Sequence, residues 1–131
     1  TGETRQVLRT AAAAMVASGT ATLETALMGC PMVIAYRMAP LGFFFIRRAV
    51  SVKFAGMVNI VAGRALCPEF IQDAATPRAI ADGMDRIATD GAERVRMIAG
   101  FKEVAAKLGA GGAHERAAEI VLEELDRSVE I

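Results

Sequence analysis

Residues that bind metals or form disulfides are rare in this sequence. Its 131 residues include two cysteines and one histidine. Cys30 and Cys67 do not form a Cys-x-x-Cys pair, and His114 by itself leaves too few ligands for a zinc site. We therefore expect no metal and no cofactor. Two reduced thiols in a cytoplasmic protein are the simplest interpretation, although the sequence leaves a disulfide open.

An excess of charge of one sign is also absent. The chain has 15 basic and 15 acidic residues, so its formal net charge is zero. This balance disfavours duplex nucleic acid as a partner, although it is compatible with a local basic patch. Hydrophobic residues make up 53% and charged residues 23% of the chain, which is typical of one folded domain rather than a disordered segment.

Hydrophobic runs long enough to cross a membrane are missing too. The most apolar stretch, Met38–Ile46, is well under the roughly 20 residues that a bilayer-spanning helix needs. Arg47 and Arg48 end this stretch. No signal peptide is visible, and the chain starts at Thr1 without an initiator methionine. We therefore expect the sequence to be part of a longer protein.

The sequence does contain the pattern of a parallel α/β unit. Ala13–Ala17 is a short apolar run that ends at Ser18 and Gly19, which favours a buried strand. Thr20–Gly29 is rich in helix-forming residues, and Met32–Tyr36 is a second strand candidate. Strand, glycine turn, helix and strand in this order predict a βαβ unit with parallel strands.

The segments after this unit have less regular patterns. A hydrophobic helix is expected over Leu41–Val50, after a proline. Val52–Val61 fits either a strand or a loop, and Pro68–Gln72 is predicted as about one helical turn.

The second half of the chain has helical patterns throughout. Thr76 and Pro77 mark a helix start, with threonine as the cap and proline at the first helical position. The next helix is expected to bury one face and to end at a group of glycines, after which a last helix follows. The expected buried face consists of Val95, Ile98, Phe101, Ala105 and Leu108, and the last helix carries Ala118, Val121, Leu122 and Leu125.

The turn Ser18-Gly19-Thr20 is the strongest candidate for a ligand site. In an open parallel sheet, ligands bind beyond the carboxyl ends of the strands, and this turn falls at such an end. Free N–H groups and the dipole of the following helix favour an anion there, typically a phosphate. The alternative is an ordinary helix start without a ligand. Glu24 comes four residues after Thr20, whereas a capping box requires a spacing of three residues. Its carboxylate is therefore either free to bind a ligand or only a favourable negative charge in the first turn of the helix.

Four ordered blocks of the sequence resemble one known family. The blocks are Val16–Glu24 (VASGTATLE), Cys30–Arg37 (CPMVIAYR), Asn59–Arg64 (NIVAGR) and Pro68–Gln72 (PEFIQ). In this order they resemble the signature of the lipid-A-disaccharide synthase family, glycosyltransferases of lipid A assembly in Gram-negative bacteria. The resemblance is specific over residues 16–72 and looser in the C-terminal helices.

The resemblance implies a fold and an activity. The family has the GT-B fold, in which two Rossmann-like domains face a cleft. Residues 1–75 would form part of the C-terminal, nucleotide-sugar-binding domain, and residues 76–131 the C-terminal helices of the same domain. The whole enzyme would transfer 2,3-diacylglucosamine from UDP to 2,3-diacylglucosamine 1-phosphate. The general base would lie in the N-terminal domain, so no catalytic residue is predicted here, and the chain alone is expected to be inactive.

The resemblance also implies roles for single residues in binding the UDP-sugar. The three residues of the turn would contact the diphosphate, and Glu24 would accept hydrogen bonds from the ribose hydroxyls. Asn59 and Gln72 would contact the donor or serve as capping or loop-bracing amides. Arg37 would bind a phosphate or pair with an acidic side chain. The predicted site is Ser18, Gly19, Thr20, Glu24, Arg37, Asn59 and Gln72.

An apolar and basic stretch indicates a second surface. Phe43, Phe44 and Phe45 precede Arg47 and Arg48, a combination that suits the surface of the inner membrane. The alternative is packing against an N-terminal domain or a second subunit, which leaves a homo-oligomer open. We expect a cytoplasmic protein that is peripheral to the inner membrane.

Two other functions remain open from the sequence. One is a non-catalytic, truncated nucleotide-binding or interaction module. The other is a related UDP-sugar transferase or epimerase. The coding sequence immediately upstream of Thr1 distinguishes the truncated module from the enzyme.

Overall fold

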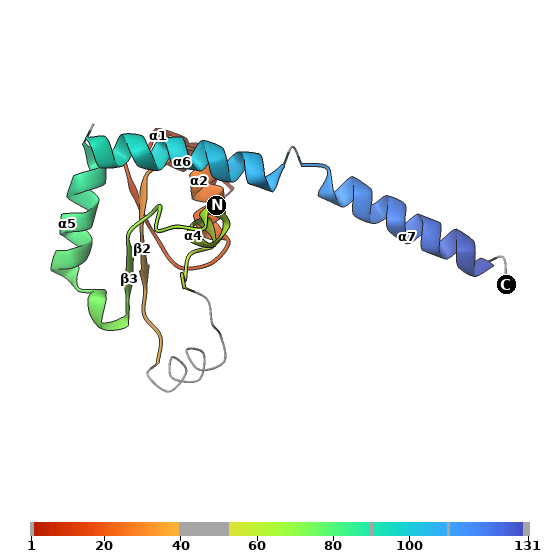
Figure 1. Ribbon diagram of the computed structural model, residues 1–131, viewed down its shortest axis with the longest axis horizontal. Coiled ribbons are helices and arrows are strands. Elements are labelled where there is room, and N and C mark those ends of the chain that lie inside the picture. The colour runs from red at the N-terminus through yellow and green to blue at the C-terminus, as the bar shows by residue number, and fades with distance from the viewer. Residues whose placement is uncertain (1, 40–52, 90, 110, 130–131) are drawn as a thin grey trace.

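Parallel strands and helices alternate along the first part of the chain. The computed structural model describes residues 2–39, 53–89, 91–109 and 111–129 (Figure 1). The elements are α1 (Thr4–Thr10), β1 (Ala14–Val16), α2 (Ala21–Leu27), β2 (Met32–Tyr36), α4 (Met57–Ala62), β3 (Glu69–Ile71), the 3-10 helix η1 (Gln72–Ala74), α5 (Pro77–Ala88), α6 (Ala92–Leu108) and α7 (Ala113–Val129).

The described strands form one parallel sheet in the order β1-β2-β3. Val16 pairs with Ile34 between the first two strands, and Ile34 pairs with Glu69 between the last two. The predicted βαβ unit is confirmed as β1, α2 and β2. The predicted α/β class is confirmed as well, and the arrangement is consistent with half of a Rossmann-like domain.

Two segments differ from their predictions. Pro68–Gln72 was predicted as a helical turn, but it contains strand β3 and the start of η1. Val52–Val61, predicted as a strand or a loop, contains most of helix α4. Both segments take their conformation from partners elsewhere in the chain: β3 pairs with β2, and the amide of Val58 in α4 bonds to Thr22. Local sequence does not show these partners.

Helices cover both faces of the sheet. Successive side chains of a strand point to opposite faces. Ile34 faces the start of α4, where a Cβ on Gly56 would lie 2.3 Å from its Cδ1, so a larger residue at position 56 would require Ile34 to shift. α5 packs on β2 from the other side, and α6 lies across α2, α4 and α5 (Figure 1). The core between these layers consists of Val16, Ala26, Met32, Val33, Ile34, Val58, Cys67, Ile87, Met97, Phe101 and Val104.

The predicted start of α5 is confirmed, whereas the predicted face of α6 is rotated. The Thr76 hydroxyl accepts a hydrogen bond from the Ala79 amide and so caps α5. α6 buries Met97, Gly100, Phe101 and Val104, while the expected core residues Val95 and Leu108 are 63% and 43% exposed. The apolar spacing missed Gly100, although its bare backbone is where Leu66 packs.

α7 extends away from the other helices (Figure 1). Its apolar side chains Ile120, Val121, Leu122 and Leu125 are 57–62% exposed. No helix in the described part of the chain is both long and apolar enough to cross a membrane.

Candidate functional site

The carboxyl ends of the strands bring together three segments that are far apart in sequence. The turn Ser18–Thr20 follows β1, Arg37 and Met38 follow β2, and Gln72 follows β3. A hydrogen bond between Gln72 and Met38 joins the ends of β2 and β3, and Ser18 bonds to Ala55 in the segment before α4. The sheet therefore gathers most of the predicted site residues along one edge, where open parallel sheets bind ligands.

Ser18 and Gly19 give the turn its shape. Gly19 has a φ of 117°, a left-handed conformation that side chains rarely adopt. Ser18 Oγ donates its proton to the carbonyl oxygen of Ala55 at 2.6 Å. A ligand at this turn would therefore meet a lone pair of Ser18 Oγ rather than its hydrogen. The Thr20 side chain is exposed, and its hydroxyl makes no hydrogen bond within the described residues.

Thr22 joins the starts of two helices, a role that the sequence did not indicate. Its side chain is 0% exposed. Its Oγ1 donates to the carbonyl oxygen of Gly19 at 2.7 Å and accepts from the amide of Val58 at 3.2 Å. The turn after β1 and the first turn of α4 are thus held together by one buried hydroxyl.

Glu24 lies on α2 within reach of solvent. Its Oε1 accepts a hydrogen bond from Nε of Arg5 in α1 at 2.9 Å, and the two side chains are 43% and 73% exposed. Oε2 has no partner among the described residues. The carboxylate predicted to be free is therefore paired at one oxygen and open at the other. Arg5 was missed because it is 19 residues away in sequence.

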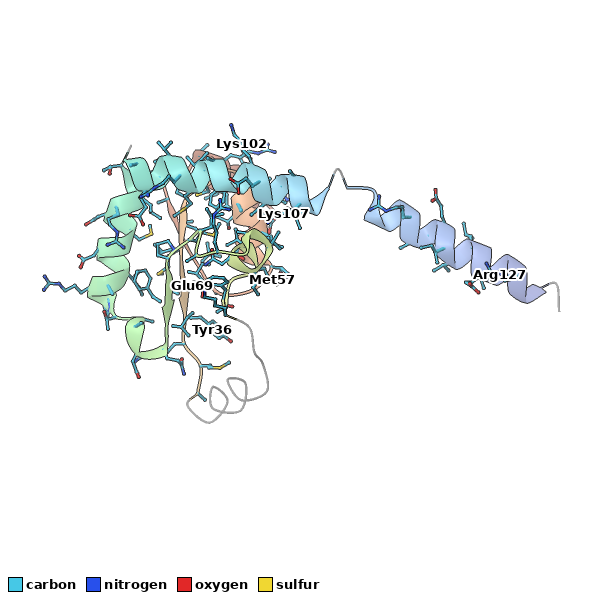
Figure 2. All side chains as sticks on the ribbon, in the orientation of Figure 1. Tyr36, Met57, Glu69, Lys102, Lys107 and Arg127 are labelled. Carbon is cyan, nitrogen blue, oxygen red and sulfur yellow. The ribbon has the colours of Figure 1, made fainter. Side chains whose placement is uncertain are left out.

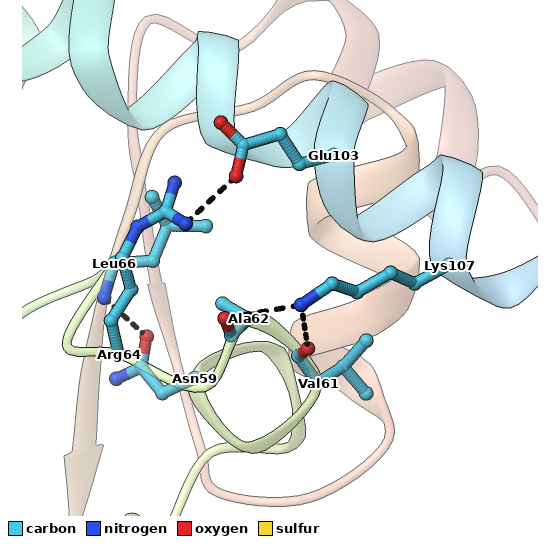
Figure 3. A network of polar contacts seen from close by, with 7 residues as sticks. All are labelled: Asn59, Val61, Ala62, Arg64, Leu66, Glu103 and Lys107. Carbon is cyan, nitrogen blue, oxygen red and sulfur yellow. Dashed lines mark hydrogen bonds and ion pairs between the residues drawn. The ribbon is translucent and has the colours of Figure 1, made fainter.

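Asn59 uses both ends of its amide inside the protein and is 0% exposed. Its Nδ2 donates to the carbonyl oxygen of Cys67 and to Oε1 of Glu69, both at 2.8 Å. Its Oδ1 accepts from the amides of Leu66 at 2.9 Å and Cys67 at 2.8 Å, the first of which is drawn in Figure 3. In this arrangement Asn59 braces the loop before β3.

Glu69 is a second residue that the sequence did not single out. Its carboxylate accepts from the amides of Ala55 and Gly56, each at 2.9 Å, and from Asn59 Nδ2 at 2.8 Å. Figure 2 shows Glu69 between β3 and α4. The strand β3 thereby holds the segment that leads into α4.

Gln72 braces the chain after β2. Its backbone has a φ of 53°, which is unusual for a residue other than glycine. Its Oε1 accepts from the amide of Met38 at 2.9 Å, and its Nε2 donates to the carbonyl oxygen of the same residue at 3.1 Å. Arg37, next to Met38, is exposed, and no described residue pairs with its guanidinium.

The predicted membrane residues Phe43, Phe44, Phe45, Arg47 and Arg48 lie outside the described residues. No group of three or more potential metal ligands is present in the described ranges.

A cavity of about 870 Å³ lies apart from the turn after β1. Its lining consists of residues 64–69, residues of α6, Phe54 and Asn59, the last of which was predicted as a donor contact. Arg64 and Glu103, both in the lining, form an ion pair at 2.7 Å (Figure 3). The hydrogen bond from Arg64 lowers the pKa of the Glu103 carboxyl and raises that of the guanidinium. Burial raises the pKa of the Cys67 thiol to about 12. None of the residues predicted for the diphosphate or the ribose lines this cavity.

The chain has the features of a Rossmann-like α/β domain. These features are a parallel sheet, helices on both of its faces and a glycine turn at the carboxyl ends of the strands. The chain belongs to the lipid-A-disaccharide synthetase family, whose model matches residues 1–121.

Individual relatives agree with this assignment. The chain is 41% identical over 124 residues to the lipid-A-disaccharide synthase of Myxococcus xanthus, covering 95% of the chain and 32% of that enzyme. It is 45% identical over 123 residues to the same enzyme of Geobacter sulfurreducens, covering 94% of the chain and 32% of the relative. For Sodalis glossinidius the identity is 38% over 125 residues, covering 95% and 32%. The chain therefore spans about a third of the length of these relatives.

Proposed function

We propose that this chain is the donor-binding part of a glycosyltransferase. The whole enzyme transfers 2,3-diacylglucosamine from UDP to 2,3-diacylglucosamine 1-phosphate and releases UDP. The observation that carries the proposal is the turn Ser18–Thr20 at the carboxyl edge of the sheet, followed by Glu24, in a member of the lipid-A-disaccharide synthetase family. Residues 1–75 and 76–131 contribute to one nucleotide-sugar-binding domain.

The turn binds the diphosphate through different groups of its three residues. Gly19 lets the backbone approach the ligand, and the exposed Thr20 hydroxyl donates to a phosphate oxygen. Ser18 fixes the shape of the turn beside the diphosphate by donating its proton to Ala55, and its remaining lone pair accepts only from a donor such as a sugar hydroxyl. Arg37, exposed at the end of β2, adds a positive charge for the phosphates.

Glu24 binds the ribose through the oxygen that Arg5 does not occupy. A single carboxylate oxygen has two lone pairs, so Oε2 can accept hydrogen bonds from two neighbouring ribose hydroxyls. Asn59 and Gln72 contribute to donor binding indirectly, by bracing the loops around the site with their buried and half-buried amides.

The chemistry of transfer requires groups beyond this chain. The donor site positions the sugar and stabilises the negative charge of the leaving UDP, two effects that account for much of the catalysis in such transfers. The general base and the acceptor site belong to the other two-thirds of the enzyme. The isolated chain is therefore inactive.

The acyl chains of both substrates place the enzyme at a membrane surface. We assign this contact to Phe43, Phe44, Phe45, Arg47 and Arg48, which combine aromatic groups with cations that suit lipid phosphates. The two free, buried cysteines agree with a reducing, cytoplasmic location.

Calorimetric titration of the full-length protein with UDP tests the donor site. Glu24→Ala is expected to weaken binding by about 1–3 kcal/mol, the usual effect of losing a hydrogen bond to a charged partner. Glu119→Ala, which removes an exposed carboxylate on α7, is the matched control and should leave UDP affinity unchanged. Equal affinity of Glu24→Ala and the wild type would refute the ribose role.

The reaction itself is tested by incubating the full-length protein with both substrates and identifying the product by mass spectrometry. The proposal expects a disaccharide 1-phosphate and free UDP. An epimerised UDP-sugar would identify an epimerase instead. UDP binding without any product would identify a non-catalytic nucleotide-binding module.

A further inference from the structure

Glu69 occupies an unusual position for a carboxylate near the end of a sheet. Three N–H groups donate to its two oxygens at 2.8–2.9 Å, two from the backbone of Ala55 and Gly56 and one from Asn59. Hydrogen bonds to an ionised acceptor are stronger than neutral ones. Glu69 thus fixes the short segment that precedes α4 from the side of β3.

The same short segment is bonded to the turn after β1 at two points. The carbonyl oxygen of Ala55 accepts the proton of Ser18 Oγ at 2.6 Å. Three residues later, the amide of Val58 donates to Thr22 Oγ1, which in turn donates to the carbonyl oxygen of Gly19. The position of residues 55–58 therefore sets the position of the turn at Ser18 and at Gly19.

Together these bonds connect β3 to the turn by a chain of short contacts. Ala55 is the direct link, because its amide bonds to Glu69 and its carbonyl bonds to Ser18. Gly56 adds a second restraint, since its amide also donates to Glu69, at 2.9 Å. A shift of the Glu69 carboxylate would move Ala55 and, with it, the hydroxyl of Ser18.

We propose that Glu69 is a positioning residue of the donor site, which sets the geometry of the turn Ser18–Thr20 for the diphosphate through Ala55 and Gly56. This role rests on the proposed function of the turn. Glu69 itself does not touch the ligand.

The chemistry of the site requires a carboxylate at this position. All three partners are donors, so the side chain must accept with both oxygens. Glutamine has the same shape but carries a donor in place of one oxygen. In Glu69→Gln, one of the N–H groups would therefore face another N–H group, and the segment would have to move.

The test compares Glu69→Gln with Glu103→Gln in the full-length protein. Glu103 is an exposed carboxylate on α6 that pairs with Arg64, so Glu103→Gln makes the same chemical change at a different ion pair. UDP affinity is measured by calorimetry, the Michaelis constant for the UDP-sugar and the turnover number by the transfer assay, and the folded fraction by circular dichroism. Glu69→Gln is expected to raise the dissociation constant of UDP about tenfold while the protein stays folded, and Glu103→Gln to change it less than about twofold.

A double-mutant cycle with Ser18→Ala separates positioning from general stability. If Glu69 acts through Ala55 on Ser18, both substitutions disturb the same contact to UDP. The dissociation constant of the double variant should then be about equal to that of the single variant that binds UDP less tightly. Fully additive effects on UDP affinity would overturn the proposal. Should Glu69→Gln fail to fold, Glu69→Asp keeps the charge while withdrawing the carboxylate by one methylene, and the same increase in the dissociation constant is expected.

The outcomes distinguish this proposal from the function it rests on. Wild-type UDP binding together with unchanged affinity in folded Glu69→Gln or Glu69→Asp overturns the positioning role alone. A lower melting temperature with unchanged UDP affinity assigns Glu69 a merely structural role and also overturns it. Absence of UDP binding in the wild type overturns the donor-site function, and the positioning role with it.

Discussion

Asn59→Asp tests the buried network most directly, because the two side chains have the same shape. Aspartate keeps an acceptor for the amides of Leu66 and Cys67. It removes the two hydrogen bonds that Nδ2 donates, to the carbonyl oxygen of Cys67 and to Oε1 of Glu69. An oxygen of the aspartate would then lie about 2.8 Å from each of these two acceptors. It also places a second carboxylate beside Glu69 at a site that is 0% exposed.

The expected loss of stability follows from these contacts. A buried acceptor that loses its donor costs about 1–3 kcal/mol, and this cost applies to the carbonyl oxygen of Cys67, whereas Oε1 of Glu69 keeps the amide of Gly56. Repulsion between the two carboxylates adds to this cost. Since a domain is stable by about 5–15 kcal/mol in total, Asn59→Asp is expected to remove a large part of its stability.

The assay is urea-induced unfolding of the full-length protein at neutral pH, followed by circular dichroism. Gln6→Glu makes the same amide-to-acid change at an exposed position of α1 and should alter stability by less than about 0.5 kcal/mol. In the Glu69→Gln background, Asn59→Asp should cost less than in the wild type, because the glutamine amide can donate to the introduced carboxylate.

Two results would contradict this reasoning. Stability of Asn59→Asp within about 1 kcal/mol of the wild type would show that the network contributes little, and weakened UDP binding in that stable variant would indicate that Asn59 contacts the donor directly. An equal cost of Asn59→Asp in the wild-type and Glu69→Gln backgrounds would place the effect outside the Asn59–Glu69 hydrogen bond.

Further predictions concern the buried thiol and the membrane surface. Because the pKa of Cys67 is raised to about 12, its unfolded form ionises near pH 9 while the folded form keeps its proton. The free energy of unfolding of the wild type should therefore fall by up to about 1.4 kcal/mol per pH unit above pH 9. Urea unfolding at several pH values should show a smaller decrease for Cys67→Ala. An equal pH dependence of the free energy of unfolding in the two proteins would refute this. Replacing Phe44 and Phe45 with serine should reduce co-sedimentation of the full-length protein with anionic vesicles, whereas unchanged sedimentation of the folded variant would favour packing against protein.

Local signals in the sequence predicted those elements whose conformation depends on neighbouring residues. The apolar run before Ser18 and Gly19, the helix after Thr20 and the cap at Thr76 were all predicted correctly. β3 and α4 were not, because their partners come from β2 and from Thr22. The prediction of the buried face of α6 was wrong, because it followed apolar side chains only. Gly100 is buried because its lack of a side chain leaves room for Leu66.

The candidate site was predictable in part for the same reason. The turn and Glu24 follow β1 directly, so a strand and a helix start were sufficient to place them at the edge of the sheet. The pairing of Glu24 with Arg5 and the bonds of Glu69 depend on tertiary contacts, and no spacing in the sequence indicates them. A single polar residue such as Asn59 fits a ligand contact and a buried brace equally well.

The direction of one proton at the turn has a consequence for selectivity. Because Ser18 gives its hydrogen to Ala55, the turn offers a lone pair beside the hydroxyl donor of Thr20. Inorganic pyrophosphate at neutral pH carries mainly acceptors and gains little from that lone pair. A nucleotide-sugar combines phosphate acceptors with sugar hydroxyl donors, so it satisfies both groups at once. If the turn holds the diphosphate as proposed, it is thus suited to discriminate a glycosylated diphosphate from the bare anion.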